Sequence, residues 1–280
     1  MTDPYLQGKI AVCNVLSDLY SLGLTRCDTM LMVLAESNKI PIEERKIVTM
    51  QMMKGFADMA KVAEAPVSGG QSIVNPSPII GGVGITVCTE EEIIRPCKAS
   101  AGDLIVLTKP LGTQIAGNLF EWFYSKRQTF EKLVEKPSEE QVNESFNIAC
   151  DMMSSLNRVP AKLMHQFGAK GATDVTGFGI LGHAGNFAAV QHAEVDFVIR
   201  KMPVIRGLHR LDKQVRDFKL KEGLSAETSG GLLVVLPREN ASGFLEAFER
   251  EEGRPAWVVG EVVQGSKKAM IAEGVAVEEV

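Results

Sequence analysis

The sequence predicts a protein with two domains, each built from both helices and strands. Its 280 residues, 45% of them hydrophobic, can bury a large core and exceed the usual size of one domain. Segments with helical and with strand periodicity occur on both sides of the small-residue stretch 99–103. We therefore expect one domain over residues 1–102 and a second over residues 103–280.

The composition argues against several classes of partner. The formal net charge is −5 and no basic block occurs, which argues against nucleic acid. No apolar run approaches the roughly 20 residues of a membrane span, and the N-terminus lacks the layout of a signal peptide. The five cysteines are scattered and include no Cys-x-x-Cys pair, which predicts buried, reduced thiols. We therefore expect a cytoplasmic protein without a disulfide framework, a zinc site or membrane contact.

A first helix is predicted over residues 8–22, because apolar side chains recur there at helical spacing. Asn14, Ser17, Asp18 and Ser21 form a narrow polar stripe on this otherwise apolar helix. One interpretation is a solvated face. The other is a site, in which Asn14 forms hydrogen bonds and Asp18 binds a metal ion or accepts a proton.

The rest of the first domain is predicted as a strand at 30–35, a helix from Pro41 and a glycine-rich strand at 79–88. The segment from Ser68 to Ser72 is predicted to interrupt this pattern as a turn. A second interpretation is that Gly70, Gln71 and Ser72 present amides and a hydroxyl to a phosphate or nucleotide. The helix should bury a methionine-rich stripe, made of Met52, Met53, Phe56, Met59, Ala60 and Ala63.

In the second domain, a buried strand at 104–107 leads into a Gly/Thr turn and a helix. Lys109 lies in this turn, at the carboxyl edge of a sheet. Two interpretations are open: Lys109 contacts a ligand, or it is solvated. His165 is expected to be structural, and Glu227 and Thr228 are expected to anchor a loop. Other predicted elements are helices at 139–157, 159–168 and 241–251, strands at 195–199, 232–236 and 257–263 and near Met270, and a loop at 208–221.

The segment Thr173–His183 (TDVTGFGILGH) places a carboxylate before a Thr-Gly turn and a helix predicted to begin near Gly177. Its three glycines would leave room for an anion to approach the first amides of that helix. Asp174 could then hold the Mg²⁺ that accompanies a phosphate. The alternative is that Asp174 caps the helix and the glycines serve close packing.

These motifs, taken in order, resemble those of selenophosphate synthetase (selenide, water dikinase). The resemblance covers essentially the whole chain. It rests on GKIAVCNVLSDLYSLG at 8–23, SGGQS at 68–72, TKPLGTQ at 108–114, ATDVTGFGILGHA at 172–184 and ETSGGLL at 227–233. Gln71 resembles the eukaryotic branch of the family.

The resemblance implies a phosphotransferase that converts ATP, selenide and water into selenophosphate, AMP and orthophosphate. It implies two α+β domains of the aminoimidazole-ribonucleotide-synthetase-like (PurM-like) fold, with the N-terminal domains of a homodimer sharing a barrel. By position, Asp18 and Asp174 match metal-binding aspartates for Mg²⁺, and Asn14 lies beside them. Gly70, Gln71 and Ser72 match a nucleotide-binding segment for ATP.

One departure from the family pattern is large. The family carries an upstream glycine-rich segment with a reactive Cys or selenocysteine and a catalytic Lys, whereas only Asp3-Pro4-Tyr5 precedes the first helix here. We therefore expect no catalytic residue of that kind in this chain, and little or no turnover. Two alternatives stay open: a non-catalytic paralogue that regulates an active synthetase, or another ATP-dependent enzyme of this fold that acts on a purine-pathway intermediate.

Overall fold

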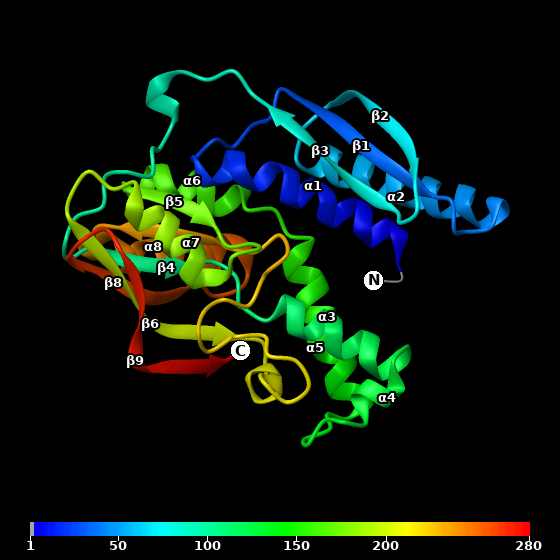
Figure 1. Cartoon of the computed structure of the whole chain (residues 1–280). Coiled ribbons are helices and arrows are strands. Elements are labelled where there is room, and N and C mark those ends of the chain that lie inside the picture. Colours follow the sequence, from blue (N-terminus) through cyan, green and yellow to red (C-terminus); the bar gives the residue numbers. More distant parts are fainter. Residues whose placement is uncertain (1–2) are drawn as a thin grey trace.

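The computed structural model describes residues 3–280 and contains two β-sheets, each packed against helices (Figure 1). The first unit has a three-stranded sheet of order β2-β1-β3, in which β1 is parallel to β2 and antiparallel to β3. Its elements are α1 (Pro4–Ser21), β1 (Thr29–Ser37), α2 (Ile42–Val62), β2 (Val67–Asn75) and β3 (Ile79–Ile85).

Helices α1 and α2 cover one face of this sheet and leave the other open. Met30 of β1 is fully buried in the cluster formed with both helices. The side chains that alternate with it point the other way: Leu31, Val33 and Val83 are 37%, 41% and 52% exposed. We call this surface the open face of the first sheet.

Two predictions for the first unit are wrong. Met53 is 43% exposed, whereas the other predicted members of the methionine-rich stripe are buried, because Met53 lies about 100° around the helix from Met52. The segment from Ser68 to Ser72 is part of strand β2, not a turn. Its backbone pairs with β1 along its length, and this tertiary pairing overrides the weak strand propensity of glycine.

The second unit has a six-stranded sheet of order β5-β7-β4-β8-β6-β9, antiparallel except for the β6–β9 pair. Its strands are β4 (Leu104–Leu107), β5 (Gly171–Asp174), β6 (Val195–Val204), β7 (Leu232–Leu236), β8 (Trp257–Gln264) and β9 (Ala269–Glu279). Its helices are α3 (Thr113–Tyr124), α4 (Arg127–Phe130), α5 (Glu139–Met153), α6 (Arg158–Gln166), α7 (Gly179–Ala189) and α8 (Arg238–Glu252), with a 3₁₀ turn η2 (Leu208–Leu211). Another 3₁₀ turn, η1 (Glu90–Glu92), lies in the connection between the two sheets.

Helices lie on both faces of this sheet (Figure 1). Alternate residues of β4 and β7 point to opposite sides, so that Val106 packs with α6 and α8 while Ile105 and Leu107 pack with α3 and α7. The predicted elements of the second domain are present, although β6 and β9 are longer than expected. Strand β5 was missed because its sequence, GATD, carries no apolar alternation.

The two sheets are joined by residues 86–103, and we propose that the domain boundary lies between residues 102 and 103. None of the helices within residues 3–280 combines the length and the apolar content that a membrane span requires.

Helix α3 begins at a buried carboxylate. Glu227 is 5% exposed and accepts the backbone N–H groups of Gly112 at 2.7 Å and Thr113 at 2.9 Å, together with the Thr113 hydroxyl. The Glu227 carboxylate thereby satisfies two backbone amides that have no partner inside the helix. The expectation that Glu227 anchors a loop is confirmed. Thr228 anchors the same loop, because its backbone N–H donates to Thr113 Oγ1 at 3.1 Å.

Burial raises the pKa of Glu227 to about 7, although the hydrogen bonds from Thr113 and Gly112 oppose the shift. Between the ordinary pKa of 4.5 and pH 7, the folded protein keeps a proton that the unfolded chain has lost. The free energy of unfolding should therefore fall across this window, by on the order of 3 kcal/mol.

In Glu227→Gln this part of the pH dependence should vanish, as measured by urea unfolding at pH 5 and pH 7.5. Substitution of exposed Glu91 by Gln is the control, and parallel curves for both variants and the parent would contradict the assignment.

Candidate functional site

Helix α1 carries two of the predicted site residues. Its start is fixed by Asp3, whose side chain accepts the N–H groups of Tyr5 at 2.8 Å and Leu6 at 3.2 Å. Gly8 lies directly on α2, since a Cβ there would be 2.1 Å from the carbonyl oxygen of Met52. With its buried sides fixed, α1 presents Asn14 and Asp18, four residues apart, on one exposed face.

The predicted polar stripe is not a single face. Ser17 is fully buried toward the second unit, whereas Asn14 and Asp18 are exposed. Ser17 follows buried Cys13 by four residues, and this spacing was the signal that could have separated it from its neighbours. The stripe therefore combines two surfaces with different neighbours.

The turn after β5 faces the same region as Asn14. Helix α7 begins at Gly179, two residues later than predicted, because Thr176 accepts backbone N–H groups from Gly179 at 3.1 Å and from Glu227 at 3.0 Å. Gly179 has a φ of +68°, and a Cβ there would be 2.5 Å from the Gly223 carbonyl oxygen. By contrast, a Cβ at exposed Gly177 would meet no atom within 4 Å. Only Gly177 among these glycines leaves the backbone open to a ligand, whereas Gly179 is required by packing.

The charge of Asp174 acts on Asp18, the other predicted aspartate. Asp174 is 9% exposed at the end of β5, and Asp18 remains exposed on one side. The pKa of Asp18 is raised, first by burial of part of its carboxylate and second by the negative charge of Asp174. Asp18 and Asp174 are 156 positions apart in the chain, and the fold brings their carboxylates close enough to interact.

His183 holds the turn in place, a role that the motif did not predict. Its Nε2 lies 3.1 Å from Thr176 Oγ1 and accepts the Phe178 N–H at 3.4 Å. Burial lowers the pKa of His183, and the opposing effect of Asp174 is smaller. The ring is therefore neutral at neutral pH and keeps the Nε2 lone pair available for these contacts.

A cavity of about 820 Å³ brings several predicted residues to one surface. Its walls are formed by α1, by α3 and by the turns at 176–177 and 226–228, and Asn14, Thr176 and Gly177 line it. Asp18 lies one helical turn beyond Asn14, and Asp174 lies two residues before Thr176. By contrast, Gly70, Gln71 and Ser72 do not line this cavity and lie on edge strand β2.

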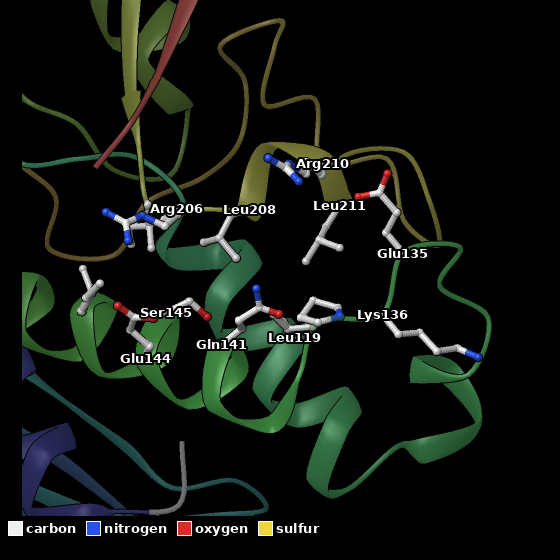
Figure 2. Close-up of a pocket in the computed structure, with 14 residues that line it drawn as sticks. Leu119, Glu135, Lys136, Gln141, Glu144, Ser145, Arg206, Leu208, Arg210 and Leu211 are labelled. Atoms are coloured by element: carbon white, nitrogen blue, oxygen red, sulfur yellow. The ribbon is translucent and has the colours of Figure 1, made fainter.

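A second cavity, of about 380 Å³, lies between α5 and η2 and contains none of the predicted site residues. Figure 2 shows Leu208 and Leu211 from η2 facing Gln141 of α5, with the charged groups of Arg206 and Lys136 directed away from the centre. We therefore place the candidate site at the larger cavity.

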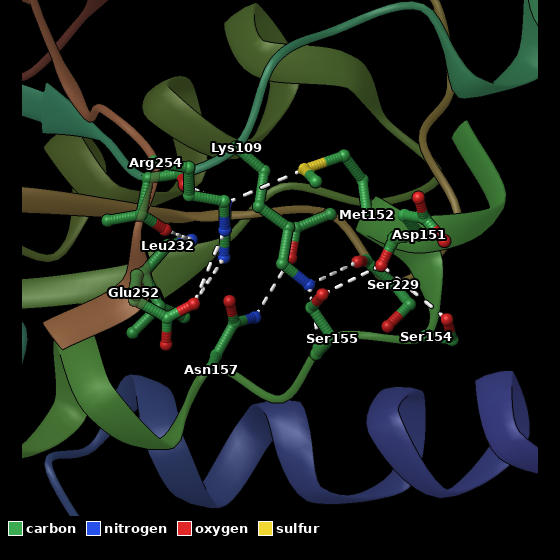
Figure 3. A network of polar contacts seen from close by, with 12 residues as sticks. Lys109, Asp151, Met152, Ser154, Ser155, Asn157, Ser229, Leu232, Glu252 and Arg254 are labelled. Atoms are coloured by element: carbon green, nitrogen blue, oxygen red, sulfur yellow. Dashed lines mark hydrogen bonds and ion pairs between the residues drawn. The ribbon is translucent and has the colours of Figure 1, made fainter. Parts of the chain in front are cut away.

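Both interpretations of Lys109 are wrong. The side chain is 1% exposed, and its Nζ donates to the carbonyl oxygens of Ser155 at 2.7 Å and Ser229 at 2.9 Å (Figure 3). It is thus neither solvated nor free to bind a ligand. His165 is structural as expected, because its Nε2 lies 2.9 Å from the Gly23 carbonyl oxygen.

The cysteines fit the expected inert thiols only in part. Cys13, Cys27 and Cys150 are buried, whereas Cys88 and Cys97 are half-buried. Burial raises the pKa of Cys13 and of Cys150 to about 11, which keeps both as thiols at neutral pH. None of the five lines the larger cavity.

The two glycines of the turn should respond differently to substitution. Gly179→Ala should lower the free energy of unfolding by at least about 1–3 kcal/mol, because alanine is strained at positive φ and its Cβ would meet the Gly223 backbone. Gly177→Ala is the matched control and should change it by less than about 0.5 kcal/mol. Urea unfolding measures both, and equal losses would contradict the distinct roles of these glycines.

Comparisons with known proteins identify the family of the chain. The chain matches the family models "AIR synthase related protein, N-terminal domain" over residues 1–88 and "AIR synthase related protein, C-terminal domain" over residues 100–273. It is 49% identical to a selenide, water dikinase of Trypanosoma brucei brucei, over 96% of this chain and 70% of that protein. It is 47% identical to selenide, water dikinase 2 of Mus musculus, over 97% of this chain and 60% of that protein.

Solved structures show the same fold at low sequence identity. Hydrogenase maturation protein HypE in complex with ATP has a TM-score of 0.68 at 19% identity, covering 94% of this chain and 75% of that one. Thiamine-monophosphate kinase from Stenotrophomonas maltophilia has a TM-score of 0.69 at 18% identity, covering 98% and 81%. The fold is thus the two-domain α+β, PurM-like architecture, and the chain belongs to the selenide, water dikinase family of AIR synthase-related proteins.

Proposed function

We propose that this chain carries the nucleotide- and metal-binding part of a selenide, water dikinase, which converts ATP, selenide and water into selenophosphate, AMP and orthophosphate. The observation that carries the proposal is the meeting of α1 and the Asp174 turn at one cavity. Asn14, Thr176 and Gly177 line that cavity, Asp18 follows Asn14 by one helical turn, and Asp174 precedes Thr176 by two residues. The relatives named above carry this activity in their names.

The two aspartates suit Mg²⁺ in chemistry and in number. Mg²⁺ prefers carboxylate oxygen and is commonly held by one or two carboxylates together with substrate phosphates. No group of three or more His, Cys, Asp or Glu side chains within residues 3–280 forms a complete metal cage. Asp18 and Asp174 would therefore hold the ion jointly with a nucleotide. When bound, Mg²⁺ would neutralise charge on the phosphate oxygens.

The other residues of the cavity would orient the nucleotide. The Asn14 amide can donate to a phosphate or a ribose oxygen, and the exposed backbone at Gly177 admits close approach of an anion. The amides of Gly112 and Thr113 are unavailable because they bind Glu227.

We assign no nucleophile to the cysteines of this chain, and we propose a cytoplasmic location on the basis of their unpaired state.

We further propose that two copies of the chain pair through the open face of the first sheet. That face exposes Leu31, Val33 and Val83 side by side on neighbouring strands, as the β1–β3 register requires. A contiguous apolar surface of this kind favours a protein partner. Gln71 pairs in register with Val33 and shares this face, so within such a pair Gln71 would contact nucleotide through its side chain, and Gly70 and Ser72 through their neighbouring backbone.

Calorimetric titration of ATP with Mg²⁺ into the parent chain, Asp18→Ala and Asp174→Ala tests the nucleotide site. We expect the parent to bind and each substitution to weaken binding at least about ten-fold, because each removes a carboxylate from the cation. Glu91→Ala, an exposed carboxylate on η1, is the control and should bind as the parent does. Unchanged binding in both aspartate variants would overturn the site assignment.

Sedimentation tests the pairing. The parent should sediment at twice the mass of a 30.4 kDa chain. Val83→Lys should shift it to the single-chain mass, because a buried lysine would lose its hydration at the interface. Val134→Lys, at an 87% exposed position in the second unit, should leave the mass unchanged. A parent chain that sediments as a monomer at high concentration would refute the pairing.

A further inference from the structure

A buried polar bridge connects the two halves of the candidate site. Asn157 lies in the connection between α5 and α6 and is 1% exposed. Its Nδ2 donates to Ser17 Oγ at 3.2 Å and to the Gly230 carbonyl oxygen at 2.9 Å. Ser17 belongs to α1 of the first unit, whereas Gly230 belongs to the loop before β7 of the second. One amide therefore links the two units inside the protein.

Each end of this bridge adjoins one of the two aspartates. Ser17 immediately precedes Asp18. Gly230 lies against the backbone of Val175, since a Cβ there would be 2.0 Å from the Val175 carbonyl oxygen. The next residue, Gly231, accepts the Val175 N–H at 2.9 Å, and Val175 directly follows Asp174. The path from Asp18 to Asp174 thus runs through Asn157 and uses only adjacent residues and direct contacts.

Lys109 fixes the frame in which Asn157 lies. Its Nζ donates to the carbonyl of Ser155, two residues before Asn157, and to the carbonyl of Ser229, one residue before Gly230. Figure 3 shows Lys109 reaching toward both segments from above, with Asn157 beside them and α1 running below. Burial lowers the pKa of Lys109 to about 7, and even the neutral amine retains two N–H groups for its two carbonyl acceptors.

The local chemistry of Asn157 indicates that stability alone does not explain this residue. Asn157 is the N-cap of α6, a position where an asparagine side chain usually accepts a backbone N–H, yet it makes no capping bond. Its Oδ1 is buried without a hydrogen-bond partner. An unpaired buried acceptor and an uncapped helix both cost free energy. The amide is therefore oriented toward the bridge at the expense of the helix that it begins.

We propose that Asn157, supported by Lys109, is a positioning residue that sets the spacing of the Asp18 and Asp174 carboxylates. This inference rests on the proposed function, because the spacing matters for a cation shared by both aspartates. Asn157 touches neither the cation nor the nucleotide. It acts through Ser17 and Gly230.

The test measures the binding of Mn²⁺ in the presence of ATP by electron paramagnetic resonance. Asn157→Leu keeps the size of the side chain and removes both donated hydrogen bonds. We expect about ten-fold to one-hundred-fold weaker Mn²⁺ binding, the usual effect of removing a residue that orients a metal ligand. Ser17→Ala removes only the α1 side of the bridge and should weaken binding in the same direction, which keeps the test decisive if the first variant does not fold.

Gln191→Leu is the matched control. Gln191 is 2% exposed, and its amide joins the carbonyls of Pro96 and Phe187, so its loss also removes buried hydrogen bonds but does not affect α1. It should bind Mn²⁺ as the parent does. A loss equal to that of Asn157→Leu would indicate a general effect of destabilisation and would overturn the inference.

A double-mutant cycle separates positioning from simple support of the fold. Asp18→Asn should weaken Mn²⁺ binding strongly in the parent but by less than about two-fold in Asn157→Leu, because a displaced carboxylate has little left to contribute. Equal effects in both backgrounds, or parent-like binding by Asn157→Leu, would overturn the inference and leave the proposed function intact. Failure of the parent chain to bind Mn²⁺ with ATP would instead overturn the proposed metal site, and the inference with it.

Discussion

Helix α1 of the first unit also packs against the second unit, and the candidate site depends on this position between them. Along one side it packs on α2 through Gly8, where any side chain would collide with the Met52 carbonyl. Along another side it contributes Ile10 to the core of the second unit and Ser17 to the bridge with Asn157. A helix held on two sides can rotate very little. Its remaining exposed face, with Asn14 and Asp18, is therefore directed at the turn after β5.

Buried polar groups fix the second unit in the same manner. Glu227 and Gly112 are 115 positions apart, and Lys109 and Ser229 are 120 positions apart, yet each pair forms a direct hydrogen bond. Such contacts carry a large desolvation cost, which appears as the raised pKa of Glu227 and the lowered pKa of Lys109. Because the partners cannot separate without exposing an unpaired group to the apolar core, the loop from Glu227 to Gly231 has little freedom. The backbone of this loop in turn supports Val175 beside Asp174.

The sequence predicted the parts of this arrangement that depend on local patterns. Apolar periodicity located most helices and strands, and the spacing of Asn14 and Asp18 correctly placed them on one exposed face. Local patterns do not reveal which neighbour covers a given residue, so they predict Ser17 on the same stripe as Asn14 and Asp18, and Lys109 at a ligand or in solvent. The glycine-rich segment of β2 has the local pattern of a turn but forms a strand, because its strand character comes from pairing with β1. Only the resemblance to a family predicted that Asp18 and Asp174 lie close together, because no local pattern relates residues that are 156 positions apart in the chain.

The pair of aspartates has an energetic consequence for cation binding. Burial and the negative charge of Asp174 raise the pKa of Asp18, so a charged Asp18 is unfavourable beside a charged Asp174, and either a proton or a cation would relieve this repulsion. A divalent cation at the proposed site would neutralise both charges at once, so the repulsion between the two carboxylates would add to the affinity for the cation. Protons would compete for the same oxygens, so the affinity of the proposed site for a cation should weaken as the pH falls toward the raised pKa of Asp18. Because this repulsion depends on the separation of the two carboxylates, the contacts that hold α1 in place also determine how strongly the site favours a cation over a proton.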